Sequence, residues 1–238
     1  MPLENILKSH QHTFATIVPF SPQKDKLLLL DFSEKNTDIT HDLLNDTTSY
    51  THYINKQLAG AGARYGIGGY AEHRPLYNRS RVFDGVNEED EPRRLHLGMD
   101  IWGKPNTAVI SPLNGIVHSF AFNNSFGDYG ATMILSHQLD GFVFHTLYGH
   151  LSMNSIRDLQ AGQRVEAGDI IGELGIAIEN GHWPPHLHFQ LIIDLENREG
   201  DYPGVCKLSE KEKYLANCPD PDLILQINQY AGYVMSDQ

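Results

Sequence analysis

The chain has 238 residues, of which 40% are hydrophobic and 20% are charged, an ordinary composition for a globular protein. Its formal net charge of −12 argues against a nucleic-acid partner, because phosphate backbones repel acidic surfaces. No stretch approaches the ~20 apolar residues that a membrane span requires. The first twenty residues lack the basic start and apolar core of a signal peptide. We therefore expect a cytoplasmic protein, or a periplasmic or exported one only if a leader precedes this sequence.

The N-terminal third is predicted to form an extension that packs on the rest of the chain. Residues 27–30 indicate a buried strand, and residues 38–58 an amphipathic helix that stops at Gly60. The glycine-rich residues 65–70 lack the lysine of a nucleotide-binding loop, so we expect a flexible turn or strand edge that lines a cleft. Arg74 follows and is a candidate to bind a substrate carboxylate; an exposed surface arginine is the alternative.

A histidine and an aspartate in the stretch HLGMD form the first candidate metal-binding pair. Residues i and i+4 lie on one face of a strand or of a helical turn, so His96 and Asp100 can converge in either structure. Imidazole nitrogens and carboxylate oxygens are both ligands of zinc in proteins.

Apolar runs separated by glycine, asparagine and aspartate predict a series of strands after residue 107. They cover residues 108–110, 116–122, 131–137 and 142–148. Between the last two, Leu139-Asp140-Gly141 predicts a tight hairpin turn. Tyr129, in the loop GDYG, is a candidate substrate-binding residue at the rim of the cleft; a role in the turn alone is the alternative.

The stretch WPPHLHFQ, residues 183–190, carries the second metal-binding candidate. Its prolines favour an extended entry, and the residues that follow favour a strand. Side chains alternate along a strand, so His186 and His188 point to the same face, roughly 6–7 Å apart. One of them can bind a metal while the other lies beside the metal-bound water. Together with His96 and Asp100, this gives the two imidazoles and one carboxylate of an open, catalytic zinc site.

Two residues at the start of this stretch are candidates for substrate binding. His182 lies in a loop where we expect the mouth of the cleft. Trp183 is expected to be exposed, as a platform for substrate, although packing is an equally ordinary role for its ring.

The order HLGMD, YGHLS, HLHFQ resembles the lysostaphin or LytM type of zinc metallopeptidase (peptidase family M23), which cuts peptide bridges in bacterial cell walls. The resemblance covers roughly residues 90–195. It implies that His96, Asp100 and His188 bind one Zn²⁺ per chain and that His150 and His186 are the non-ligand histidines of the site. We assign His150 and His186 jointly as general base and oxyanion stabiliser, without deciding which does which.

The architecture implied is mainly β: an antiparallel sheet or sandwich, a duplicated barrel-sandwich hybrid, with short helices and an α-containing N-terminal extension. We divide the chain into this extension at residues 1–90, a zinc metallopeptidase core at 91–196 and a C-terminal extension at 197–238.

In the C-terminal extension, Ser209 and Glu212 predict a capping box for a short helix. Cys206 and Cys218, the two cysteines of the chain, are expected to be free thiols. No C-x-x-C metal motif occurs in the sequence.

Three functions remain open. The first is a zinc metalloendopeptidase that hydrolyses peptide bonds of peptidoglycan-type substrates by a metal-activated water. Residues 180–190, with 202–206 and 218–221, are also similar to peptidase-like domains fused to class III aminotransferases; this second possibility favours a cytoplasmic zinc hydrolase of a small peptide or amine metabolite. The third is a IIA-like phosphocarrier on the same architecture, although Asp100 would repel a phosphohistidine. The oligomeric state, the scissile bond and any occlusion of the cleft by the extension are not fixed by the sequence.

Overall fold

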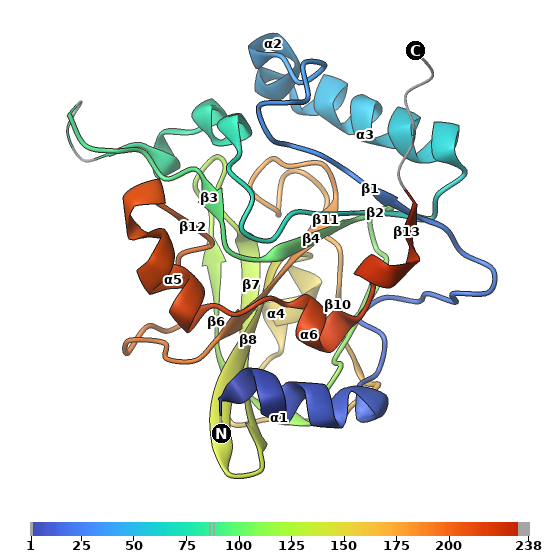
Figure 1. Ribbon diagram of the computed structural model, residues 1–238, viewed down its shortest axis with the longest axis vertical. Helices are drawn as coiled ribbons and strands as arrows, with labels where there is room; N and C mark the ends of the chain where they lie inside the picture. Colours follow the sequence, from blue (N-terminus) through green and yellow to red (C-terminus); the bar gives the residue numbers. More distant parts are fainter. Residues whose placement is uncertain (1, 86, 88, 233–238) are drawn as a thin grey trace.

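The structure is a computed structural model and describes residues 2–85, 87 and 89–232 (Figure 1). Its main sheet is built from β1 (Leu27–Leu29), β2 (Tyr65–Gly68), β4 (Met99–Trp102), β6 (Gly115–Asn123), β7 (Gly130–Leu139), β8 (Phe142–Leu151), β9 (Arg164–Val165), β11 (His186–Ile192) and β13 (Ala231–Gly232). Among the described residues these strands form one sheet in the order β13-β1-β2-β4-β11-β8-β7-β6-β9. β1 runs parallel to β2 and to β13, and the other neighbours are antiparallel.

Two smaller strand pairs and several short helices complete the fold. β3 (Leu95–His96) pairs with β12 (Val205–Cys206), and β5 (Ala108–Ile110) pairs with β10 (Ile170–Glu173). The helices are α1 (Leu3–His10), α2 (His41–Asn45), α3 (Thr47–Ala61), α4 (Asn154–Arg157), α5 (Lys211–Asn217) and α6 (Asp222–Leu225). Short 3-10 helices occur at Gln11–Thr13, Pro75–Arg79 (η2), Arg81–Phe83 (η3), Leu208–Glu210 and Asn228–Tyr230. The expected mainly β fold with few short helices is confirmed.

The predicted strands of the central region are confirmed: β5 has the predicted bounds, and β6, β7 and β8 extend by one to three residues at one or both ends. The hairpin between β7 and β8 turns at Asp140 and Gly141, which both have positive φ (49° and 81°). Such a turn matches the right-handed twist of the paired strands. Strand β11 lies between β4 and β8, and all seven of its residues are buried. The strand that carries the two adjacent histidines is therefore an inner strand of the sheet.

The single helix expected at residues 38–58 is wrong in its ends and its continuity. The chain forms α2 and α3 instead, separated at Asp46, whose carboxylate accepts hydrogen bonds from Thr48 N and Ser49 N. An aspartate that caps a new helix start competes with helix continuation. The helix then runs through Gly60 and ends where Gly62 adopts φ +60°, the left-handed conformation that glycine takes without steric cost.

The flexible turn or strand edge expected at residues 65–70 is also wrong. Residues 65–68 form β2, which is buried between β1 and β4. A Cβ atom on Gly66 would lie 2.5 Å from Leu30 Cδ1, and one on Gly68 would lie 2.6 Å from Leu30 O. The glycines therefore allow close packing of neighbouring backbone rather than flexibility.

The capping box predicted for the C-terminal helix does not form. Helix α5 begins after Glu210 without a side-chain cap, and Ser209 N donates instead to the carboxylate of Glu91. Cys206 and Cys218 are free and buried, as expected, and burial raises the pKa of each thiol to about 12.

The N-terminal extension shares a hydrophobic core with the predicted peptidase region. Its strands β1 and β2 continue the main sheet next to β4, and α2 and α3 lie together above β1 and β2 in Figure 1. A buried cluster joins Tyr50, Ile54 and Tyr77 of the extension to Trp102 and Trp183. The boundaries at residues 90 and 196 stay a prediction.

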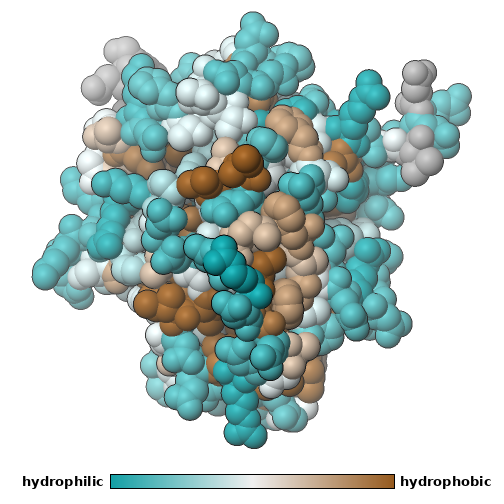
Figure 2. All heavy atoms as spheres, turned by 180° about the vertical axis from the view of Figure 1, so that it is seen from behind, coloured by the Kyte–Doolittle hydropathy of each residue, from teal (hydrophilic) through white to brown (hydrophobic). Residues whose placement is uncertain are grey.

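The opposite face of the molecule is mostly hydrophilic, with hydrophobic side chains grouped near its centre (Figure 2). In the described part of the chain, no helix is both long and apolar enough to cross a membrane.

Candidate metal centre

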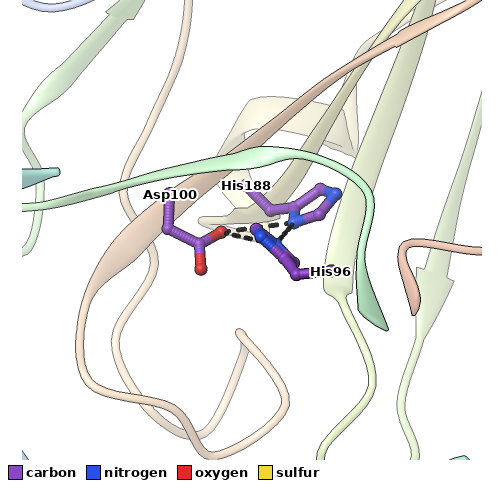
Figure 3. Close-up of side chains that lie close together, drawn as sticks. All are labelled: His96, Asp100 and His188. Carbon is purple, nitrogen blue, oxygen red and sulfur yellow. Dashed lines mark hydrogen bonds and ion pairs between the residues drawn. The ribbon is translucent and has the colours of Figure 1, made fainter. Parts of the chain in front are cut away.

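Three side chains from two stretches about ninety residues apart in the sequence meet at one buried point. His96 Nε2 lies 2.9 Å from His188 Nδ1 and 3.3 Å from Asp100 Oδ1, and His188 Nδ1 lies 3.2 Å from the same oxygen. Figure 3 shows the three side chains pointing toward one another. Each is at most 3% exposed, so their donor atoms face one another rather than solvent.

Pairing between strands sets this arrangement. In the antiparallel pair β4–β11, Asp100 lies directly opposite His188. His96 ends β3, which two residues separate from β4, and its side chain meets the other two at the same point. Gly98 makes the close approach possible, because a Cβ atom there would lie 2.6 Å from both Cε1 and Nε2 of His188.

The outer nitrogens of both histidines are held by other groups. His96 Nδ1 donates to Gly69 O at 3.0 Å, which leaves Nε2 directed to the centre. His188 Nε2 lies 2.9 Å from Gln190 Oε1 and can donate to it, which leaves Nδ1 directed to the centre. Outer partners of this kind fix the ring orientation of metal-binding histidines and are typical of metal sites.

Asp100 is held by a buried arginine. Arg74 Nη1 donates to Asp100 Oδ2 at 2.5 Å, and Arg74 Nε donates to Glu72 Oε2 at 2.6 Å. Burial by itself would raise the pKa of Asp100, but His96 and Arg74 outweigh it and hold this pKa well below its usual range. Burial, followed by the charge of Arg74, lowers the pKa of His96 to about 4. The centre therefore presents a carboxylate and neutral imidazole, the forms that bind a metal.

The donor triangle fits a tetrahedral ion. Ligands bound at about 2.0–2.1 Å in a tetrahedron are roughly 3.3 Å apart, close to the 2.9–3.3 Å separations observed here. Two nitrogens and one oxygen also match the ligands of catalytic zinc sites, which leave a fourth position open. These residues fit zinc in both geometry and chemistry.

Two further histidines lie beside the donor triangle. His186 Nδ1 donates to Pro184 O at 2.7 Å, and His150 Nδ1 donates to Asn180 O at 2.8 Å, so each ring keeps Nε2 for other partners. Their ring centroids are 4.1 Å apart, and His186 Nε2 is 4.0 Å from Asp100 Oδ1. Burial lowers the pKa of His186 to about 4 and that of His150 well below its usual range.

The backbone at His150 has an uncommon conformation, with φ +64°. Histidine tolerates the left-handed region only at a cost, and such residues are concentrated at functional sites. The hydrogen bonds from His150 N to Tyr129 O and from Gly175 N to His150 O, both 2.9 Å, hold the conformation. They also bring the imidazole over the centre at the end of β8.

A cavity of about 490 Å³ adjoins the centre and includes Asp100, His150, His186 and His188 in its lining. Tyr129 also lines it: its hydroxyl donates to Tyr202 O at 3.1 Å. The cavity is thus the space in which a substrate would meet the candidate metal centre.

The other candidate substrate-binding residues have different fates. Arg74 lines the cavity but is 1% exposed, so its alternative as a surface arginine is wrong. Trp183 also lines the cavity, but its expected exposure is wrong: the ring is 5% exposed and lies against Arg79 and His186. His182 is exposed and lies outside the cavity lining, with its ring centroid 5.5 Å from that of Phe126. A substrate role for any of these residues stays a prediction.

Sequence reasoning missed several residues that position the site. Gln190 follows His188 by two on the same strand, so strand alternation alone places the two on one face. Asn180 is fully buried, and its side chain ties the loop around Trp183 through bonds to Trp183 N and O. Tyr77 lines the cavity from the N-terminal extension, a contact for which the sequence carries no signal.

Comparison with known protein families identifies the part of the chain that carries this site. Residues 94–199 match the model of peptidase family M23. This part of the chain is a family M23 peptidase domain. Family M23 consists of metallopeptidases, typically zinc enzymes that act on peptidoglycan. The domain includes His96, Asp100, His150, His186 and His188.

The chain is also similar, at low sequence identity, to several solved structures of peptidases. The catalytic domain of lysostaphin from Staphylococcus simulans is 22% identical, with 68% of this chain and 97% of that one covered and a TM-score of 0.40. Lysostaphin itself is 23% identical, with 71% and 52% covered and a TM-score of 0.42. A zinc-containing peptidase from Vibrio cholerae is 26% identical, with 41% of this chain and 27% of that one covered and a TM-score of 0.33. Our chain thus matches about a quarter of that protein's length. A search among curated proteins found no match.

Proposed function

We propose that the protein is a zinc-dependent peptidase that hydrolyses peptide bonds by a metal-activated water, with one Zn²⁺ per chain held by His96, Asp100 and His188. The carrying observation is the triangle of donor atoms 2.9–3.3 Å apart, whose outer nitrogens are both occupied. A zinc ion at this triangle supplies a Lewis acid and lowers the pKa of a coordinated water toward 7.

His150 and His186 are proposed to handle the protons of the reaction. Each donates through Nδ1 to a backbone carbonyl and presents Nε2, so a neutral ring accepts a proton and a protonated ring donates one. One of the two takes the proton of the attacking water, and the other donates a hydrogen bond to the oxyanion that forms on the scissile carbonyl.

Peptidoglycan-type peptides are the first substrates to test, because family M23 typically acts on peptidoglycan. A small cytoplasmic peptide or amine metabolite is the second, and the cavity volume of about 490 Å³ favours a substrate of that size. The aminotransferase-associated subgroup and the cytoplasmic location stay predictions, and the phosphocarrier alternative has no separate support.

Metal content of single-site variants tests the assignment. We expect about one zinc per wild-type chain, none in the His96→Ala/Asp100→Ala double variant or in His188→Ala, and full zinc in His150→Ala with turnover of stem peptides lost. Elemental analysis and mass spectrometry of peptide digests measure the two quantities. Equal zinc in wild type and His188→Ala, or none in either under zinc-replete conditions, would sink the assignment.

A further inference from the structure

The cavity above the candidate metal centre is covered by the N-terminal extension. Several of its lining residues come from α3 and from the segment 74–83: Tyr50, Arg74, Leu76, Tyr77, Val82 and Phe83. The M23 domain and the residues after it supply the other walls, including Tyr129, Trp183 and the run 202–205. The extension therefore forms part of the cavity wall and narrows the approach to the metal-binding residues.

One side of the cavity is bounded by a cluster that we call the roof and define as Tyr77, Arg79 and Trp183. Tyr77 and Trp183 line the cavity, and Arg79 supports Trp183 from outside the lining. The Tyr77 and Trp183 rings meet edge to face with centroids 6.2 Å apart, and the Arg79 guanidinium lies 4.4 Å from the Trp183 ring. Arg79 Nη2 also donates to His182 O at 3.1 Å, which ties the extension to the loop before β11. Segments about a hundred residues apart in the sequence are joined here directly over the site.

The side chains at the centre are almost fully buried beneath the cavity. Asp100 and His188 are each 3% exposed, and His150 is 6% exposed. A polymer needs a groove that is open at both ends, because a cross-linked strand has no free end to thread into a closed pocket. A cavity of about 490 Å³ instead has the size of sites that enclose small ligands.

The accessible side of the cavity carries charges of both signs. Arg198 and Asp201 are exposed, and Arg93 and Asp128 are partly exposed lining residues. A short peptide brings an ammonium and a carboxylate close together, so this pairing of charges complements both of its ends.

Two buried donors in the lining have no partner among the described residues. They are Arg74 Nη2 and Trp183 Nε1. A buried N–H without an acceptor costs free energy, which a bound oxygen atom recovers. Carbonyl and carboxylate oxygens of a peptide supply such acceptors at close range.

We propose that this cavity, narrowed by the extension, selects short, soluble peptides and excludes polymeric or cross-linked peptide substrates. The proposal rests on the proposed zinc-peptidase function and specifies its substrate class. Size is set by the roof, and orientation by the unpartnered donors and the charged mouth.

The test uses metal-binding probes of different bulk on the cobalt-substituted full-length protein, whose visible spectrum reports on the metal. Acetohydroxamic acid is the small probe, and the same hydroxamate attached by a short linker to dextran is the bulky probe. We expect the small probe to shift the spectrum and the bulky probe to bind roughly 100-fold more weakly, which is two factors of ten in Kd.

Variants of the roof assign the exclusion to it. Arg79→Ala and Tyr77→Ala, each checked for folding by circular dichroism, are expected to admit the dextran probe. Arg81→Ala is the matched control, because it removes an exposed arginine from the same segment, whereas Arg79 is the one that contacts the Trp183 ring and donates to His182 O. It is expected to behave as wild type.

The outcomes separate this proposal from the proposed function. Equal binding of both probes by wild type would overturn the size limit, and exclusion of both would show a sealed site and overturn substrate entry. Continued exclusion of dextran by both folded roof variants would overturn the role of the roof. Failure to bind cobalt at all would instead contradict the zinc-peptidase function itself.

Discussion

At position 98 there is no room for a side chain, because the ring of His188 occupies the space into which it would project. The ring atoms Cε1 and Nε2 would be 2.6 Å from a Cβ atom, and Phe189 O would be 2.8 Å from it. The neighbouring backbone belongs to the inner strand β11 and has no room to retreat. The absence of a side chain at Gly98 therefore allows the segment that bears His96 and Asp100 to lie close to His188.

We therefore expect Gly98→Ala to push His188 away from His96 and Asp100. Metal affinity should fall by roughly 10- to 100-fold, the range seen when partners that orient a ligand are lost. Competition with a chromophoric chelator measures the affinity. Gly60→Ala is the control, since nothing lies within 4 Å of a Cβ atom at that position; unchanged zinc affinity in Gly98→Ala would refute the packing argument.

The sequence predicted some contacts within the site but not others. The spacing of His96 and Asp100 indicated their convergence, and strand alternation placed His186 and His188 on one face. The contact of Arg74 with Asp100 could not be predicted, because the two residues are 26 positions apart and no local periodicity relates them. The sequence suggested Arg74 only as a substrate-binding residue, whereas in the structure it is buried and orients the metal-binding residue Asp100.

At the scale of elements, helix α3 shows that hydrophobic periodicity identifies a helix but does not fix the residue at which it ends. Its apolar stripe was recognisable, but Gly60 looked like a stop. The helix passes through Gly60 and ends at Gly62, whose N–H donates to Ala59 O at 3.1 Å. Two glycines two residues apart therefore have opposite requirements.

Alanine substitution separates these requirements. Gly60→Ala should stabilise the protein by roughly 0.5–1 kcal/mol, because alanine is the better helix residue at an unobstructed position. Gly62→Ala should destabilise it by about 1 kcal/mol, because alanine is strained at φ +60°. Urea unfolding monitored by circular dichroism measures both changes. The same sign for both variants would contradict this placement of the helix end.

The extension is joined to the M23 domain by strand pairing and not only by contacts between single side chains. Strand β2 pairs with β4 in register, with Gly68 opposite Asp100. The pairing places the following segment, which bears Arg74 and Tyr77, over the metal-binding residues. The pattern of the sequence predicted an attached extension, but the sheet edge at which it attaches depends on nonlocal pairing.

For the whole molecule, buried histidines make stability depend on pH. His137 is 3% exposed, donates through Nδ1 to Asn114 O, and has its pKa lowered to about 4 by burial. Its folded pKa is below the unfolded value near 6.5, so the unfolded state binds the proton first. The stabilising contribution is complete above about pH 6.5 and is lost as the pH falls toward 4.

Acidification of the metal-free protein from pH 7 to pH 5 should therefore cost about 2 kcal/mol of unfolding free energy through His137 alone, at 1.36 kcal/mol per unit. His137→Gln removes this titration, so its loss over the same interval should be smaller by about that amount. Denaturant unfolding at the two pH values, in a chelator, provides the comparison. Parallel losses in the two proteins would mean that His137 is protonated in the folded state at pH 5.

The sequence by itself determined the mainly β architecture, the succession of central strands and the identity of the residues that meet at the candidate metal centre. The strands follow from local alternation, and the choice of metal-binding residues follows from the resemblance of three short motifs to family M23, both of which depend on neighbouring residues. Only the tertiary structure decided that β2 is an inner strand, that Trp183 is buried, and that the extension roofs the cavity. Each of these depends on which distant segments pair and pack, and burial by a distant segment leaves no local periodicity to read.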